Sequence, residues 1–136
     1  MRLAVHKKFV AMLLGFAFAA HVFAADHRVF EIRTYTTPEG KLETLNKRFR
    51  EHTMKLFERH GMTNIGYWMP QDAPLAGHTL IYIVAHQSRE AAKKNWDEFN
   101  NDPEWKQVKA ASEANGPVVT KVESVFVDPT DYSPLK

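Results

Sequence analysis

Three side chains that could do chemistry stand at alternate positions of one short stretch, residues 29–36. They are the carboxylate of Glu31, the guanidinium of Arg33 and the phenol of Tyr35. β-Branched and aromatic residues alternate there over the length of a strand, so these three side chains point to one face. Burying such a row is costly unless its groups pair with one another or line a wet cavity. We expect a cavity in which Arg33 binds an anion; an ion pair with Glu31 is the alternative.

A second pair of candidate catalytic groups lies in residues 79–86, which also have the composition of a strand. Tyr82 and His86 share one face of it. Together with the carboxylate and phenol of the first stretch, they are acid–base groups that could act on a small organic ligand. Cofactor-independent oxygenation or isomerisation needs only such groups and an apolar pocket. Trp68 is a further candidate ligand contact, and the alternative for Trp68, Tyr82 and Tyr35 is a place in the core.

Several kinds of site lack support in the sequence. The chain has no cysteine, which excludes disulfides, thiolate nucleophiles and thiolate-bound metals. It contains no glycine-rich phosphate loop and no nucleophile elbow. The histidines at positions 52, 60, 78 and 86 do not have the spacing of metal ligands. We therefore predict a site without a metal or other cofactor.

The charge distribution argues against nucleic acid as a partner. The formal charge is +2, but three basic residues and no acidic ones fall within residues 1–25. The rest of the chain has 15 basic and 16 acidic residues, or −1. A near-neutral domain has no basic stripe to neutralise phosphates. Its length of 136 residues and its 44% apolar content fit one globular domain.

The first 25 residues have the features of a secretory signal peptide. Basic residues at positions 2, 7 and 8 precede an apolar run over 9–18, and small residues follow at Ala24 and Ala25. An uncleaved membrane anchor is the alternative, but the run is short for a bilayer span. We predict cleavage after residues 1–25, a periplasmic or secreted domain over 26–136, and no stable membrane insertion after cleavage.

The elements that position the candidate groups follow from the periodicity of the chain. Strands are expected over 29–36, 62–69, 79–86 and 118–127, a helix over about 41–60, a helix capped by Ser88, and a short helix restarted at Pro103. The order strand, helix, strand, strand, helix, strand is typical of the α+β, ferredoxin-like βαββαβ fold. In that fold, the helices cover one face of an antiparallel sheet.

The other sheet face then needs a cover. We expect the helices to pack on the face of Phe30 and Ile32. This leaves the opposite apolar set exposed, namely Val29, Tyr35, Leu80, Tyr82 and Val84. Such a face predicts a homodimer in which two sheets close a barrel.

Three segments carry a family resemblance. The Glu-x-Arg-x-Tyr strand around Arg33, with Gly66-Tyr67-Trp68 and the run from Trp96 through Asp102-Pro103-Glu104-Trp105, resembles the NIPSNAP family of the dimeric α+β barrel superfamily. The resemblance covers about residues 29–128 and implies the fold and the dimer. The family has no settled common reaction, and its mitochondrial members are described as scaffolding or signalling proteins. The superfamily includes haem-degrading and quinol-type monooxygenases and lactone isomerases, which are precedents for an activity.

Two functions therefore stand at this point. The first is an exported protein that binds or transforms a small organic ligand, without a metal, in a pocket between sheet and helices. The second is a non-catalytic dimeric module that presents its surface to a partner. A pocket filled by the protein's own aromatic side chains favours the second.

Overall fold

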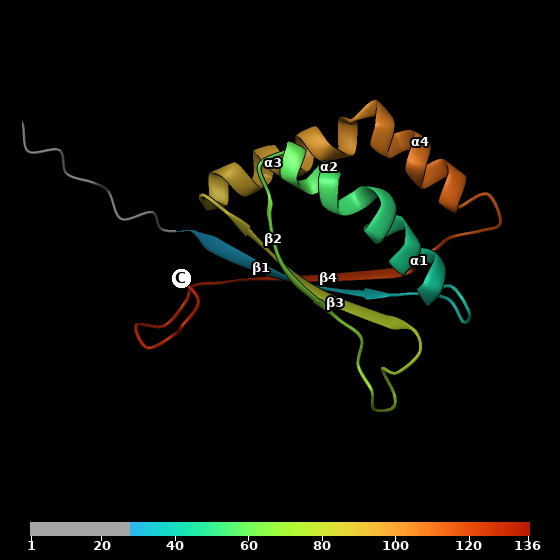
Figure 1. Ribbon diagram of the computed structural model, residues 1–136, viewed down its shortest axis with the longest axis horizontal. Helices are drawn as coiled ribbons and strands as arrows, with labels where there is room; N and C mark the ends of the chain where they lie inside the picture. The colour runs from blue at the N-terminus through green and yellow to red at the C-terminus, as the bar shows by residue number, and fades with distance from the viewer. Residues whose placement is uncertain (1–27) are drawn as a thin grey trace, which may run out of the picture.

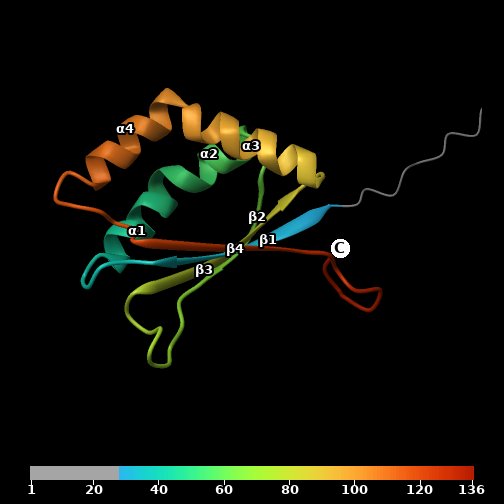
Figure 2. The ribbon, with the colours of Figure 1, turned by 180° about the vertical axis from the view of Figure 1, so that it is seen from behind.

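The computed structural model describes residues 28–136, and the predicted signal peptide lies outside this range. It contains one antiparallel sheet in the order β2-β3-β1-β4, with all helices over one face (Figures 1 and 2). The strands are β1 (Val29–Thr36), β2 (Thr63–Trp68), β3 (Thr79–His86) and β4 (Lys121–Val127). The helices are α1 (Leu42–Arg48), α2 (Met54–Arg59), α3 (Arg89–Asn101) and α4 (Pro103–Ser112), with a π-helical turn over Phe49–Thr53. The predicted α+β, ferredoxin-like fold is confirmed.

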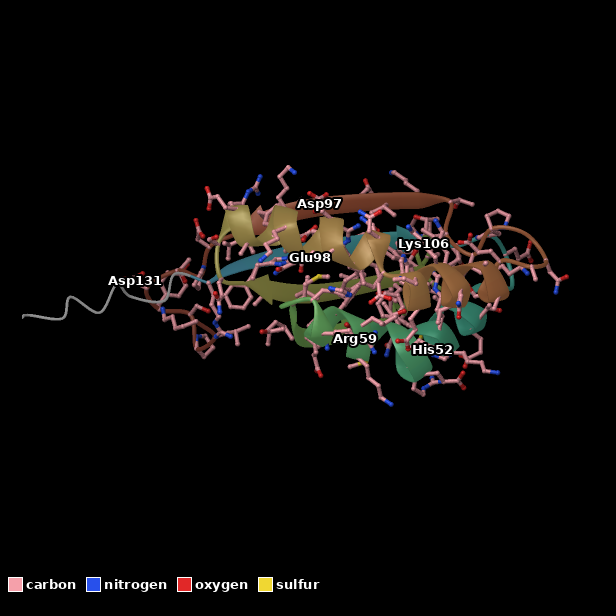
Figure 3. All side chains as sticks on the ribbon, turned by 90° about the horizontal axis from the view of Figure 1, so that it is seen from above. His52, Arg59, Asp97, Glu98, Lys106 and Asp131 are labelled. Atoms are coloured by element: carbon pink, nitrogen blue, oxygen red, sulfur yellow. The ribbon has the colours of Figure 1, made fainter. Side chains whose placement is uncertain are left out.

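The helices form two rods that lie side by side over the sheet, as seen from above in Figure 3, where His52 and Arg59 mark one rod and Lys106 the other. The first rod is one continuous helical segment, α1, the π-helical turn and α2, where the sequence predicted a single helix. It ends at Gly61, whose φ of +77° suits glycine. No helix in the described part of the chain is long and apolar enough to cross a membrane.

The second rod is two helices joined at a sharp break. The Ser88 hydroxyl accepts a hydrogen bond from the backbone N–H of Ala91 and caps α3, as predicted. Asp102 caps α4 by accepting from the backbone N–H groups of Glu104 and Trp105, and Pro103 occupies the first turn. The break sets α3 and α4 at an angle to each other (Figure 1).

The core lies between the sheet and the helices, and it uses the opposite sheet face from the predicted one. Leu80, Tyr82 and Val84 of β3 pack in the core against helix residues that include Phe49 and Phe57. The expectation that these strand residues face outward is therefore wrong. Both faces are apolar along β3, so the alternation alone does not choose between them, and the larger side chains occupy the face under the helices.

The face without helices is also apolar. Ile32 lies opposite Ile83 in the β1–β3 pairing and opposite Val125 in the β1–β4 pairing, so the three side chains share this face. Val125 is 59% exposed, and Trp68 at the end of β2 is 52% exposed. We call this surface, formed by Ile32, Ile81, Ile83, Val125 and Trp68, the open sheet face. The C-terminal tail curls at the end of the sheet beside the start of β1 (Figure 1).

Candidate functional site

The carboxylate of Glu31 is the centre of a buried hydrogen-bond network. One oxygen, Oε1, accepts from Arg33 Nη1 and Ser124 Oγ, each at 2.6 Å. The other oxygen, Oε2, accepts from Trp96 Nε1 at 2.6 Å and lies 3.0 Å from His86 Nε2. Glu31 is only 1% exposed, and its partners come from β1, β3, β4 and α3. We call these five residues the Glu31 network.

The network holds the carboxylate in its ionised form. Burial raises the pKa of Glu31, but the hydrogen bonds from His86, Ser124, Trp96 and Arg33 outweigh burial and lower the pKa from 4.5 to about 2. The predicted ion pair between Glu31 and Arg33 is present, at 2.6 Å. The carboxylate of Glu31 accepts from all four of these side chains and so holds them in place relative to one another.

His86 lies behind Glu31 and is 1% exposed. An ionised carboxylate can only accept, so His86 Nε2 donates to Glu31. His86 Nδ1 lies 3.2 Å from Asn95 Nδ2, and this amide also donates to the backbone carbonyl of Gly61. Both ring nitrogens are therefore engaged within the protein, and the predicted catalytic role of His86 stays a prediction.

Beside this network, a cavity of about 460 Å³ lies between the sheet and both helical rods. Its size falls in the range of small-molecule sites. Arg33 and Tyr35 of β1 line it, as the sequence predicted for a ligand site, whereas Glu31, Tyr82 and His86 do not. Six aromatic rings form much of the wall, from Tyr35, Phe49, Phe57, Trp96, Phe99 and Trp105. The arrangement suits a ligand with a flat apolar body and an anionic group.

Arg33 connects the network to the cavity. Its Nη1 donates to Glu31, and its guanidinium stacks 4.1 Å from the centre of the Trp96 ring. Its Nη2 lies 3.4 Å from the Tyr35 hydroxyl, a long contact. Its Nε is buried without a hydrogen-bond partner among the described residues. The guanidinium is thus fixed on one side and still has a donor to offer.

Tyr82 is fully buried below Tyr35, and its ring packs 5.1 Å from the Tyr35 ring. Within residues 28–136, its hydroxyl has no hydrogen-bond partner. Burial, together with the nearby phenol of Tyr35, raises its pKa well above the ordinary value. The phenol of Tyr82 therefore stays protonated near neutral pH and can donate a hydrogen bond, but it neither acts as a base nor releases its proton readily.

Replacing Tyr82 with phenylalanine removes this buried, unpaired hydroxyl. We expect the free energy of unfolding to stay level or rise by about 1 kcal/mol, because an unsatisfied buried polar group costs roughly 1–3 kcal/mol. The matched control is Tyr67→Phe, which removes a hydroxyl that donates to Asn64. Urea unfolding of both variants makes the comparison. Equal losses of stability would show that the Tyr82 hydroxyl does have a partner.

Trp68 lies away from the cavity. It belongs to the open sheet face, and its ring covers Gly66 so closely that a Cβ there would come within 2.5 Å of it. It borders a smaller groove of about 270 Å³ with Met54 and Tyr67. The structure therefore separates Trp68 from Arg33 and Tyr35, and its ligand contact stays a prediction.

The sequence analysis missed Arg48, which lines the cavity and is only 5% exposed. A regular helix would place His52 on the same face as Arg48, four residues earlier. The π-helical turn adds a residue to that turn, so Thr53 is buried and the side chain of His52 is 44% exposed. The signal that could have found Arg48 is its position three residues after the buried Leu45, which places both side chains on one side of the helix.

Trp96 and Ser124 were also missed as partners of Glu31. They lie 65 and 93 residues away in the chain, and no local pattern links them to it. Within residues 28–136, no three histidine, aspartate or glutamate side chains converge where they could hold a metal ion.

Comparison with solved structures places the fold among proteins of two kinds. A NIPSNAP family protein from Agrobacterium tumefaciens is 23% identical, with a TM-score of 0.70 over 81% of this chain and 100% of that one. The monooxygenase ActVA-Orf6 of Streptomyces coelicolor, solved with the ligand nanaomycin D, is 14% identical, with a TM-score of 0.56 over 79% and 92%. SnoaB, a cofactor-independent oxygenase from Streptomyces nogalater, is 12% identical, with a TM-score of 0.52 over 79% and 98%. These likenesses concern the fold.

No match was found among curated proteins. The NIPSNAP family model, in contrast, matches residues 30–134, which include the β1 strand, the cavity and the Asp102-Pro103-Glu104-Trp105 segment. The match spans nearly all of the described structure, and the resemblance seen in the sequence is thereby confirmed. The chain belongs to the NIPSNAP family.

Proposed function

We propose that this protein binds a small organic ligand in the cavity between the sheet and the helices, with Arg33 and Tyr35 as polar contacts. The observation that carries the proposal is a cavity of about 460 Å³ that the protein's own aromatic side chains line but do not fill. A non-catalytic module needs no such space. An open aromatic cavity beside a fixed guanidinium is what a binding site for a flat, polar-tipped molecule requires.

The relatives in fold support binding and suggest a direction for chemistry. One of them was solved with a bound organic ligand, and another is a cofactor-independent oxygenase. Of the four acid–base groups predicted from the sequence, the one that lines the cavity is the phenol of Tyr35. Ligand binding is therefore the function proposed here, and conversion of the ligand would use Tyr35 as the proton donor.

Replacing Arg33 with methionine should weaken ligand binding, and the protein should stay folded because Glu31 keeps its other three hydrogen-bond partners. A buried charge-assisted hydrogen bond is worth roughly 1.5–3 kcal/mol, or about 10- to 150-fold in affinity. Native mass spectrometry of protein purified from its own source should show a bound organic molecule, and the Arg33→Met variant should lose it. Arg50→Met is the control. Arg50 lies on the first helical rod, which forms part of the cavity wall, but its side chain is 67% exposed.

A ligand-free spectrum for the wild-type protein, or an occupied Arg33→Met variant, would count against the proposal. If Arg33→Met unfolds the protein, then Arg33→Lys keeps the charge facing Glu31 while losing the fork of donors. It should remain folded and bind more weakly.

We also propose that two copies associate through the open sheet face. Four or five apolar side chains at roughly 1.5–3 kcal/mol each would supply on the order of 10 kcal/mol, which offsets much of the rigid-body cost of association. A second copy brings an identical apolar face across a two-fold axis, and the twist of the two sheets then matches. The non-catalytic scaffold function would use the outer surface of this dimer.

Export is the third proposal. It rests on residues 1–25 alone, with their basic start, apolar run and small residues at positions 24 and 25. N-terminal sequencing of protein from the exporting cell should give a chain that starts near Ala25 or Asp26. A chain that still starts at Met1 would contradict export by cleavage.

A further inference from the structure

Arg48 places a second guanidinium in the wall of the cavity. It is the last residue of α1, immediately before the π-helical turn, and its side chain is 5% exposed. Its Nη1 donates to Ser112 Oγ at 3.0 Å, and its guanidinium lies 5.1 Å from the centre of the Trp105 ring. Its Nε is buried and has no hydrogen-bond partner among the residues described. Arg48 is thus a fixed, nine-tenths buried cation with a free donor.

The charge of Arg48 is poorly balanced. Its nearest carboxylate, Glu113, lies 3.5 Å from Nη1 and is itself 28% exposed. Burial lowers the pKa of Arg48, and the attraction of Glu113 does not make up for it. Arg33 differs, because Tyr35, Tyr82 and the carboxylate of Glu31 outweigh burial and raise its pKa. Arg48 has the longer ion pair of the two, at 3.5 Å against 2.6 Å for Arg33, and an added anion would help to balance its charge.

The cavity as a whole has an excess of positive charge. Three basic side chains line it, from Arg33, Arg48 and Lys109, against the single carboxylate of Glu113. The carboxylate of Glu31 lies outside the lining and has all its lone-pair positions occupied by the network. A ligand with a negative group would reduce this excess, and one with a positive group would add to it.

The unpartnered atoms also indicate the shape of that negative group. Each arginine has an Nε that is buried without a partner among the described residues, and a guanidinium binds a planar carboxylate through two parallel hydrogen bonds. The indoles of Trp96 and Trp105 lie beside these two guanidiniums and would pack against a ring system.

We propose that the ligand is an aromatic carboxylate, whose carboxylate group binds the guanidiniums of Arg48 and Arg33 while its ring packs against the aromatic wall that includes Trp96 and Trp105. This inference rests on the proposed binding function of the cavity and names the class of molecule that the cavity accepts. It also makes Arg48 a specificity-determining residue, because Arg48 contributes charge that a neutral ligand does not use.

The experiment compares two probes of the same shape, 2-naphthoate and the neutral 2-naphthamide, by isothermal titration calorimetry on the purified protein. The wild type should bind the carboxylate about tenfold or more tightly than the amide. Arg48→Met should weaken naphthoate binding by a similar factor and naphthamide binding by clearly less, because the neutral amide forms no ion pair with Arg48. Arg50→Met, which removes an exposed charge two residues away, should change neither affinity.

The outcomes separate the inference from the function on which it rests. Equal binding of the two probes by the wild type would overturn the aromatic carboxylate and leave the binding function in place. An equal loss of both affinities in Arg48→Met would show a structural role for Arg48 and would also overturn the inference. Failure of both probes to bind at millimolar concentration would overturn the binding function too. If Arg48→Met does not fold, the wild-type comparison still decides, and Arg48→Lys should keep a preference for naphthoate with reduced affinity.

Discussion

Replacing Glu31 with glutamine is expected to lower the free energy of unfolding by about 3–5 kcal/mol. The substitution removes the negative charge that faces the buried guanidinium of Arg33 at 2.6 Å. It also turns an amide N–H₂ toward a group that can only donate, either the indole of Trp96 or the guanidinium of Arg33. The loss is a large share of the 5–15 kcal/mol that stabilises a typical domain. Urea unfolding at pH 7 measures it.

The pH dependence of stability provides an independent readout of the same group. The folded pKa of Glu31, about 2, lies below its ordinary value of 4.5, so the unfolded chain takes up the proton first. The contribution, on the order of 3 kcal/mol, is complete above pH 4.5 and is lost as the pH falls toward 2. The Glu31→Gln variant should lack this acid-dependent loss.

Two further variants make the result specific. Glu43→Gln removes a carboxylate that is 76% exposed, and it should change the stability by less than about 0.5 kcal/mol. The double variant Glu31→Gln with Arg33→Met removes both charges, and it should recover part of the loss because no buried guanidinium remains unpaired. A Glu31→Gln protein whose acid profile parallels that of the wild type would contradict the network.

The second large effect is expected at the open sheet face. Ile83→Asp should convert the proposed dimer into a folded monomer and weaken self-association by about 100-fold or more. Ile83 lies opposite Ile32 near the middle of this face, so a carboxylate there would be buried without a partner in the dimer but solvated in the monomer. Sedimentation equilibrium gives the dissociation constant, and circular dichroism shows whether the monomer is folded.

The control for Ile83→Asp is a charge change on the opposite side of the molecule. Lys106 lies on α4 in the second helical rod (Figure 3), and Lys106→Asp should leave the association constant unchanged. A wild-type protein that stays monomeric at high micromolar concentration would rule out the dimer. Ile83→Asp and Lys106→Asp would then show only how an exposed apolar surface affects the solubility of the protein.

The strands were predictable because their signals are local. Residues 29–36 and 79–86 alternate β-branched and aromatic side chains, and both strands have the predicted bounds. The Ser88 cap was equally clear, because a serine before a helical pattern has one common use. The NIPSNAP resemblance followed from segments of fixed sequence along the chain.

The choice of sheet face was not predictable, because it depends on distant residues. A row of Glu31, Arg33 and Tyr35 is too polar to bury under the helices unless distant residues pair with it, and Trp96 and Ser124 supply hydrogen-bond donors to Glu31. The exposure of His52 was not predictable either, because a π-helical turn changes the helical period and the sequence has no simple signal for it. Arg48 lies before that turn, three residues after the buried Leu45, so its burial was open to prediction.

The Glu31 network also has a consequence for the cooperativity of unfolding. β4 is an edge strand whose first five residues are exposed, so it would ordinarily fray at little cost. Its Ser124 hydroxyl, however, shares a carboxylate with α3, β3 and β1. Lifting β4 from the sheet removes a donor from a buried anion and admits water to it, and the same anion holds the Trp96 wall of the cavity. Edge strand and cavity wall therefore open as one unit, and a ligand that holds one of them closed protects both.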